Sequence, residues 1–110
     1  MADSEWLEKG VAMRRELYGD AAVARSNAAN YDDPIMGKFI DYAQEAVFGG
    51  LWARPGLDLK TRTLICVISD TVMGREEELA IHLRFALRQG WTEDELTESM
   101  LQLSGYIGLP

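Results

Sequence analysis

Apolar residues recur at helical spacing along most of the chain, and short runs rich in Gly, Pro and Asp interrupt them. No stretch alternates between apolar and polar positions as a half-buried strand does, so the pattern predicts an all-α fold of five to six helices. Cap and break residues set the boundaries. The expected helices run from Ser4 to Gly19, over 20–30, from Pro34 after Asp33 until the Gly49–Gly50 pair ends or loosens the helix, from Asp58 to Gly74, over 76–89, and from the capping box of Thr92 and Glu95 to Gly108.

The helix after Asp58 differs from the others, because residues 64–68 (Leu-Ile-Cys-Val-Ile) are apolar on nearly every side. A helix without a polar face must be buried over most of its surface. In so small a domain, this predicts burial against other subunits as well as against the chain's own core. We therefore expect a homo-oligomer.

Length and composition restrict the class of protein. The 110 residues fit one domain, 1–110, which is long enough to bury its own core. The net charge of −7 argues against a nucleic-acid partner, which would require clustered Lys and Arg. No apolar run is long enough for a membrane span, and the first residues lack the features of a secretory signal. A single cysteine excludes an internal disulfide and suits a reducing compartment, so we expect a cytoplasmic protein.

Few residues are available for catalysis, since there is no Gly-rich phosphate loop, no Gly-x-Ser-x-Gly elbow and no His cluster with metal-binding spacing. His82 is the only histidine, and Glu78 lies one helical turn before it, so the two side chains can touch. A carboxylate beside an imidazole fixes the tautomer of the ring and suits proton transfer near neutral pH. The commoner interpretation of such a pair is an ion pair on a solvated face. However, the apolar stripe of Leu79 and Leu83 places His82 at the edge of the packed surface.

Three further residues have structural interpretations. Arg62 lies near the start of the apolar helix, where its side chain can extend along apolar surface or pair with Asp58 one turn earlier. Trp52 precedes the Arg54-Pro55-Gly56 loop and can anchor it by packing. Cys66 lies in an apolar helix with no base nearby in the sequence, which favours an inert core thiol.

Several segments, in their order and spacing, resemble the carboxymuconolactone decarboxylase family over nearly the whole chain. These segments are Leu51–Arg62 with its Trp-Ala-Arg-Pro-Gly motif, Gly74–Leu79, His82–Leu87 with Gly90, Thr92–Leu96 and the tail Gln102–Pro110. The resemblance implies an all-α subunit of the alkylhydroperoxidase-D-like type that assembles into trimers or hexamers and needs no cofactor.

The resemblance also implies a reaction, in which γ-carboxymuconolactone loses CO₂ to give β-ketoadipate enol-lactone in aromatic catabolism. The electrons left behind delocalise through the C=C bond onto the lactone carbonyl, so the substrate is its own electron sink. A proton must then be delivered to carbon, and cations must hold the substrate carboxylates. For this chemistry we expect His82 to be the proton donor, with Glu78 as its orienting carboxylate. We expect Arg62 and Arg75 to bind the substrate carboxylates and Trp52 to form a wall of the pocket.

Some positions depart from the family and from its sister branch. Gly50, two places before Trp52, stands where many members of the decarboxylase branch have an acidic residue. The sister branch of alkylhydroperoxidase-D-like proteins has a Cys-x-x-Cys before its histidine, and Arg75 and Glu78 occupy those two positions, which excludes thiol peroxidase chemistry. Thr63 lies at or near the position of that branch's relay Glu. A different lactone or enolisable acid as substrate, and a non-catalytic helical oligomer, are therefore the alternatives.

Overall fold

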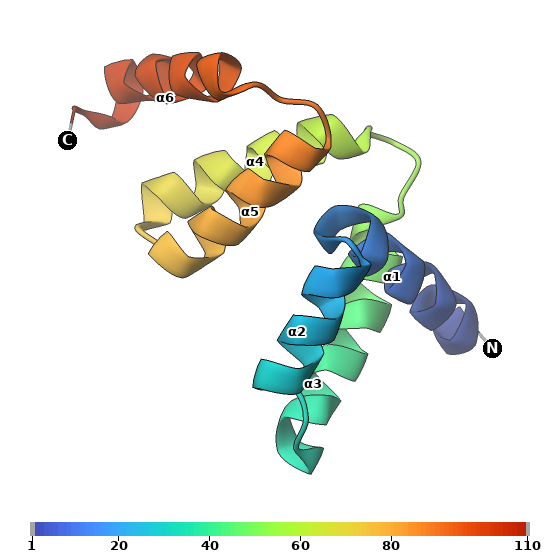
Figure 1. Cartoon of the computed structure of the whole chain (residues 1–110). Coiled ribbons are helices and arrows are strands. Elements are labelled where there is room, and N and C mark those ends of the chain that lie inside the picture. Colours follow the sequence, from blue (N-terminus) through green and yellow to red (C-terminus); the bar gives the residue numbers. More distant parts are fainter. Residues whose placement is uncertain (1, 110) are drawn as a thin grey trace. The chain divides into compact units, whose positions relative to one another are not determined.

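The computed structural model describes residues 2–109, with side chains from residue 5 onward, and all regular structure in this range is helical (Figure 1). Six α-helices and one π-helix follow one another: α1 (Ala2–Tyr18), α2 (Asp20–Asn30), α3 (Pro34–Ala43), η1 (Gln44–Trp52), α4 (Leu59–Met73), α5 (Glu76–Arg88) and α6 (Glu93–Ile107). The prediction of an all-α fold is confirmed. Within residues 2–109, no helix combines the length and the apolar character that crossing a membrane requires.

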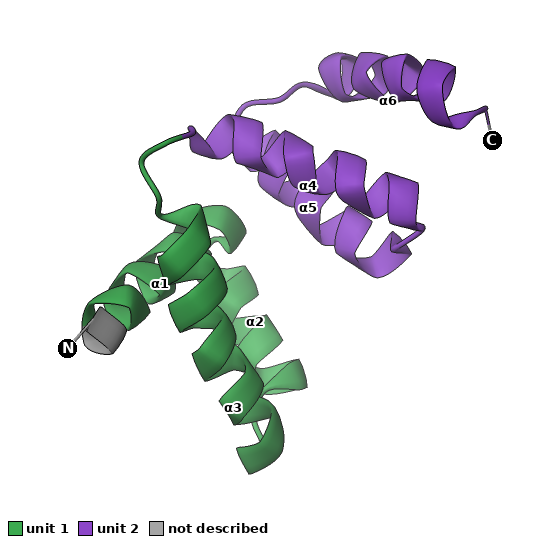
Figure 2. Cartoon of the chain, turned by 180° about the vertical axis from the view of Figure 1, so that it is seen from behind, with its two compact units in different colours: residues 1–56 green, residues 57–110 purple. Residues whose placement is uncertain are grey.

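The helices form two compact units, which Figure 2 shows in different colours. Unit 1 comprises residues 1–56 and contains α1, α2, α3 and η1, whereas unit 2 comprises residues 57–110 and contains α4, α5 and α6. The boundary falls in the gap that the sequence predicts between two helices, next to Pro55 and Gly56.

The helix boundaries in unit 1 largely agree with the sequence. α2 covers the predicted residues 20–30, and Asp33 caps α3 by accepting hydrogen bonds from two backbone N–H groups of its first turn, both at 2.9 Å. α1 begins at Ala2, so Ser4 lies inside the helix and not before it. The helix stops before Gly19, whose φ of 84° is rarely adopted by a residue with a Cβ atom.

The Gly49–Gly50 pair loosens the third predicted helix and does not end it, because α3 continues directly into the wider turns of η1. Gly49 and Gly10 lie where η1 and α1 pack against each other. A Cβ atom on Gly49 would lie 2.8 Å from the carbonyl carbon of Trp6, and one on Gly10 would lie 2.6 Å from that of Gln44. The absence of side chains at these two glycines therefore allows the backbones of α1 and η1 to approach closely.

Arg14 of α1 holds unit 1 together from the inside, since the residue is only 1% exposed. Its guanidinium donates hydrogen bonds to Asn27 and Ser26 of α2, at 2.7 and 3.2 Å, and to Gln44 of η1 at 3.4 Å. Two tyrosine rings face it, with centroids 5.3 and 5.6 Å away. A buried charge requires such polar partners, so this network ties α1, α2 and η1 to one another.

Unit 2 is built on α4 and α5, which pack against each other, and α6 contacts α4. The centre of its apolar core is formed by Val67 of α4, Ala86 of α5 and Leu96 of α6, all of them buried. Partly buried residues pack around them: Leu64, Leu79, Leu83, Trp91 and Met100. The apolar stripe that the sequence predicts on α5 therefore faces this core.

Local hydrogen bonds define the helix ends of unit 2 as the sequence predicts. Asp58 caps α4 by accepting a hydrogen bond of 2.7 Å from a backbone N–H group of the first turn. Gly74 ends α4 in the left-handed conformation, with φ of 71°. Thr92 and Glu95 form the expected capping box at the start of α6.

Within unit 2, the other helices bury one face of α4, which contains Thr63, Val67 and Asp70. Apolar residues on other sides of the helix stay exposed: Ile65, Val72 and Met73. The contacts inside unit 2 therefore do not cover this helix on most sides, and its predicted burial against other subunits stays a prediction.

Candidate functional site

His82 and Asp70 form a side-chain pair between α5 and α4. Nδ1 of His82 forms a hydrogen bond with Oδ2 of Asp70. The side chain of Asp70 is 9% exposed and that of His82 is 22% exposed, so the pair lies at the edge of the core and part of the imidazole remains accessible. The buried ring of Phe85 makes an edge contact with the imidazole, with the centroids 5.4 Å apart. A polar contact and an aromatic contact thus define the orientation of the ring.

The short connection between the two helices places this pair. The N–H of Arg75 donates to the carbonyl of Asp70 at 2.9 Å, and the left-handed Gly74 between them completes a Schellman-type end of α4. Because α5 begins at Glu76, Asp70 and His82 each lie within two turns of the connection. The backbone that carries Asp70 is therefore held by the same hydrogen bonds that end the helix.

The structure pairs Glu78 with Arg75 and not with His82. The Glu78 carboxylate and the Arg75 guanidinium are 2.7 Å apart, and both side chains are partly exposed. The hydrogen bond from Arg75 is the main cause that lowers the pKa of Glu78, and the charge of His82 contributes less. The expectation that Glu78 orients the imidazole is thus corrected, because a permanently charged donor three residues earlier engages this carboxylate and Asp70 makes the contact with His82.

Arg62, Cys66 and Asp70 follow one another at four-residue intervals and so lie along one side of α4. Arg62 lies about 12 Å from Asp70 along the helix axis, and its Nε donates to the carbonyl of Leu57 at 3.1 Å. Burial raises the pKa of the Cys66 thiol, and the charge of Asp70 raises it further. A thiol that stays protonated agrees with the interpretation of Cys66 as inert.

The other residues that the sequence singled out occupy different surroundings. Trp52 is the last residue of η1 and is buried, and it belongs to unit 1, whereas His82 belongs to unit 2. A Cβ atom on Gly50 would lie 3.4 Å from the indole ring of Trp6. Thr63 is fully buried, and its hydroxyl donates to a backbone carbonyl of its own helix at 2.6 Å.

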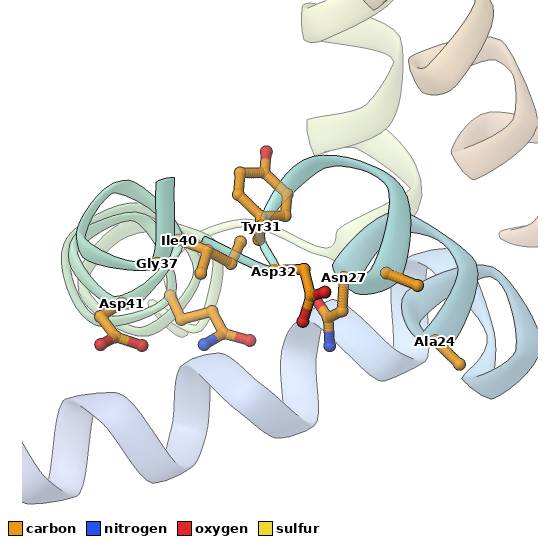
Figure 3. Close-up of a pocket in the computed structure, with 9 residues that line it drawn as sticks. Ala24, Asn27, Tyr31, Asp32, Gly37, Ile40 and Asp41 are labelled. Atoms are coloured by element: carbon orange, nitrogen blue, oxygen red, sulfur yellow. The ribbon is translucent and has the colours of Figure 1, made fainter. Parts of the chain in front are cut away.

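Two pockets can be described, and both belong to unit 1. The larger, of about 510 Å³, lies between α2 and the α3–η1 helix and is lined by Ala24, Asn27, Ala28, Tyr31, Asp32, Gly37, Ile40, Asp41 and Gln44 (Figure 3). The smaller, of about 330 Å³, is lined by four residues of α3: Ile35, Lys38, Phe39 and Tyr42. Neither of these pockets contains a residue that the sequence predicted for the site.

Asp70 is the residue that the sequence analysis missed, although the sequence contains a signal for it. It is a carboxylate on a helix that is otherwise largely apolar, and a buried carboxylate requires a partner. Spacing within one helix identifies only neighbours three or four residues apart, so it favoured Glu78 as the partner of His82. Asp70 lies on the adjacent helix, twelve residues before His82, where spacing along one helix gives no signal.

Known proteins provide an independent comparison. The model of the carboxymuconolactone decarboxylase family matches residues 38–110. The chain is 37% identical to the 4-carboxymuconolactone decarboxylase of Acinetobacter baylyi over 110 residues, which cover 100% of this chain and 81% of the relative. It is 31% identical to the nitrosuccinic acid decarboxylase npaB of Metarhizium robertsii, over 94% of this chain and 71% of the relative. The family match and the similarity over the whole length show that this chain belongs to the carboxymuconolactone decarboxylase family.

Proposed function

We propose that this protein is a cofactor-independent decarboxylase of a small carboxylated substrate, with γ-carboxymuconolactone as the first candidate. The observation that carries the proposal is His82, the chain's only imidazole, which is partly exposed and bonded to a buried carboxylate. An imidazole held in this way can deliver a proton to carbon near neutral pH. Two relatives are named as decarboxylases, which supports the same reaction type.

The two substrates in those names share the features that make a cofactor unnecessary. In γ-carboxymuconolactone, the electrons left by CO₂ pass through the C=C bond to the lactone carbonyl. In nitrosuccinic acid, the nitro group on the carbon that bears a carboxylate accepts them. Both reactions end with the addition of a proton to carbon, and both substrates have a second carboxylate that a cation can bind.

The proposed reaction breaks the C–C bond to the departing carboxylate and forms a C–H bond with the proton from His82. Arg62 is the first candidate for binding the remaining carboxylate, since a guanidinium can form two parallel hydrogen bonds with it. Arg75 is the second candidate, and the contact of 2.7 Å with Glu78 would hold it in place.

The test is the release of CO₂ from γ-carboxymuconolactone by the purified protein. We expect His82→Ala to lower turnover by about 10²- to 10⁴-fold, the usual contribution of a positioned proton donor, while the far-UV circular dichroism spectrum stays unchanged. Arg84→Ala, on the exposed side of the same helix, is the control and is expected to retain the wild-type rate. A wild-type rate in His82→Ala would remove the imidazole from the mechanism.

A second substrate class follows from the similarity to the nitrosuccinic acid decarboxylase. The same assay with nitrosuccinic acid distinguishes the two classes, because the substrate that this chain uses is expected to show the higher kcat/KM. If the folded protein releases CO₂ from neither compound, a different enolisable acid or a non-catalytic helical oligomer becomes the better interpretation.

We also propose that the chain works as one domain within a homo-oligomer, a trimer or a hexamer. The family match begins at residue 38 in unit 1 and extends through unit 2. Ile65, Val72 and Met73 are 55%, 53% and 65% exposed, and neighbouring subunits would cover such apolar residues. Sedimentation equilibrium provides the test, and a monomer at micromolar concentration would refute this part of the proposal.

A further inference from the structure

We propose that Asp70 is a positioning residue for His82: its carboxylate imposes the Nδ1–H tautomer on the ring, so that Nε2 is the atom that donates the proton to the substrate. This inference rests on the proposed function. Three observations carry it, namely the hydrogen bond between Nδ1 and Oδ2, the burial of Asp70, and the hydrogen-bonded helix end that holds its backbone.

The tautomer follows from which atoms can donate. An ionised carboxylate only accepts hydrogen bonds, so a neutral imidazole beside it must have its hydrogen on the nitrogen that faces the carboxylate. In this structure that nitrogen is Nδ1 of His82. The side chain of Asp70 is 9% exposed, so water competes little for its oxygens. Nε2, on the far edge of the ring, is then the nitrogen that remains for the substrate.

The other ionisable groups near Asp70 and His82 do not fix the tautomer of the imidazole. On α5, the Glu78 carboxylate is bonded to Arg75, and its side chain is 41% exposed to water. The backbone N–H of Arg75 bonds to the backbone carbonyl of Asp70, whereas its guanidinium acts on the Asp70 carboxylate through its charge. On α4, Cys66 lies one turn before Asp70, and its thiol is kept protonated by burial. Asp70 is therefore the carboxylate that can govern the protonation of the ring.

The direction of proton transfer fits this arrangement. The charged ring has a hydrogen on both nitrogens, and the Nε2 proton moves to the substrate carbon as CO₂ leaves. The electron pair of the broken N–H bond stays on Nε2. The electrons of the broken C–C bond enter the conjugated system of the substrate, and an electron pair of the resulting enolate or nitronate forms the new C–H bond. The ring is left as the Nδ1–H tautomer that Asp70 already binds, so it does not have to rotate before water returns a proton to Nε2.

Asp70→Asn tests the inference, because it preserves the shape of the side chain and removes its charge. An amide can donate or accept, so it no longer imposes one tautomer. The assay uses whichever of the two candidate substrates the wild-type protein decarboxylates. We expect the kcat of the variant to fall about 10- to 100-fold, the range typical of losing the group that orients a functional histidine. KM is expected to change by less than about threefold, because substrate binding is not affected. Glu77→Gln removes the same charge from an exposed position on α5 and is expected to retain wild-type kinetics.

NMR spectroscopy identifies the tautomer of His82 directly and needs no activity assay. Because the chain has one histidine, ¹⁵N-histidine labelling gives NMR signals from one ring only. At alkaline pH we expect the Nδ1–H form in the wild type and a mixture of tautomers in Asp70→Asn. If Asp70→Asn does not fold, the wild-type spectrum alone decides the assignment.

The outcomes separate this inference from the proposed function. An Nε2–H ring in the wild type would overturn the role of Asp70, as would an Asp70→Asn variant with unchanged kcat and unchanged tautomer. An Nδ1–H ring in a protein that releases CO₂ from neither substrate would instead refute the proposed function, while the assignment of the tautomer to Asp70 would stand.

Discussion

Gly49 and Gly50 are neighbours in η1, yet a methyl group added to each would meet different surroundings. On Gly49, the new Cβ atom would lie 2.8 Å from the carbonyl carbon of Trp6 and 3.2 Å from the carbonyl oxygen of Gln44. Both contacts are with helix backbone, which cannot rotate out of the way as a side chain can. On Gly50, the Cβ atom would lie 3.4 Å from the indole ring of Trp6, an ordinary van der Waals contact.

The two substitutions are therefore expected to change stability in opposite directions. Replacing Gly with Ala inside a helix stabilises the folded state by about 1 kcal/mol, and Gly50→Ala is expected to gain up to this amount. In Gly49→Ala the same gain is opposed by a steric cost of about 3 kcal/mol, the upper end for overpacking, because α1 and η1 must separate. The expected net loss is about 2 kcal/mol, or about 8 °C in Tm for a chain of this length.

Thermal unfolding followed by far-UV circular dichroism measures this difference, and urea titration gives the free energy of unfolding. Gly50→Ala is the matched control, since it makes the same chemical change one residue away in the same helix. Equal stability of the two variants, or a more stable Gly49→Ala, would show that α1 and η1 do not pack through this glycine.

Two further predictions concern the polar contacts of each unit. Arg14→Met removes three hydrogen bonds from the interior of unit 1 and is expected to lower the free energy of unfolding by about 2 to 4 kcal/mol. Arg15→Met changes an exposed side chain and is expected to stay within about 0.5 kcal/mol of the wild type. Urea titration measures both variants, and equal free energies of unfolding would contradict the hydrogen bonds around Arg14. In unit 2, the backbone N–H of Thr61 lowers the pKa of Asp58 below 3.8, so this cap stabilises the folded state above that pH and loses its effect as the pH falls through the lowered value. Asp58→Ala is expected to unfold at lower urea concentration than the wild type at neutral pH, and this difference is expected to shrink in acid; a gap that stays constant with pH would refute the role of the carboxylate.

Most helix boundaries could be predicted, because they depend on residues close in the sequence, although α1 begins before the predicted cap at Ser4. Asp33, Asp58 and the capping box at Thr92 bond to backbone groups within three residues of themselves, and Gly74 ends α4 by its own backbone conformation. Such signals are visible in the sequence before any tertiary contact forms. The Gly49–Gly50 pair could not be interpreted fully in this way, since its role depends on how closely α1 approaches.

The hydrogen-bond partner of His82 in the candidate site also could not be predicted from local sequence. The sequence identified the ring itself, because the chain has one histidine, and placed it at the edge of the core. It also placed Glu78 within reach along the helix, but a guanidinium on the preceding turn engages that carboxylate. Only the packing of α4 against α5 shows that Asp70, twelve residues earlier, makes the contact.

The all-α class, most helix ends and the family resemblance follow from the amino-acid sequence alone, because these features depend on local hydrogen bonds, on periodicity and on the order of short motifs. The tertiary structure decided which side chains meet across helices: Asp70 with His82, Arg14 with the neighbouring helices, and Gly10 and Gly49 with backbone. Contacts between residues far apart in the sequence depend on how whole helices are placed, and no local pattern specifies that placement.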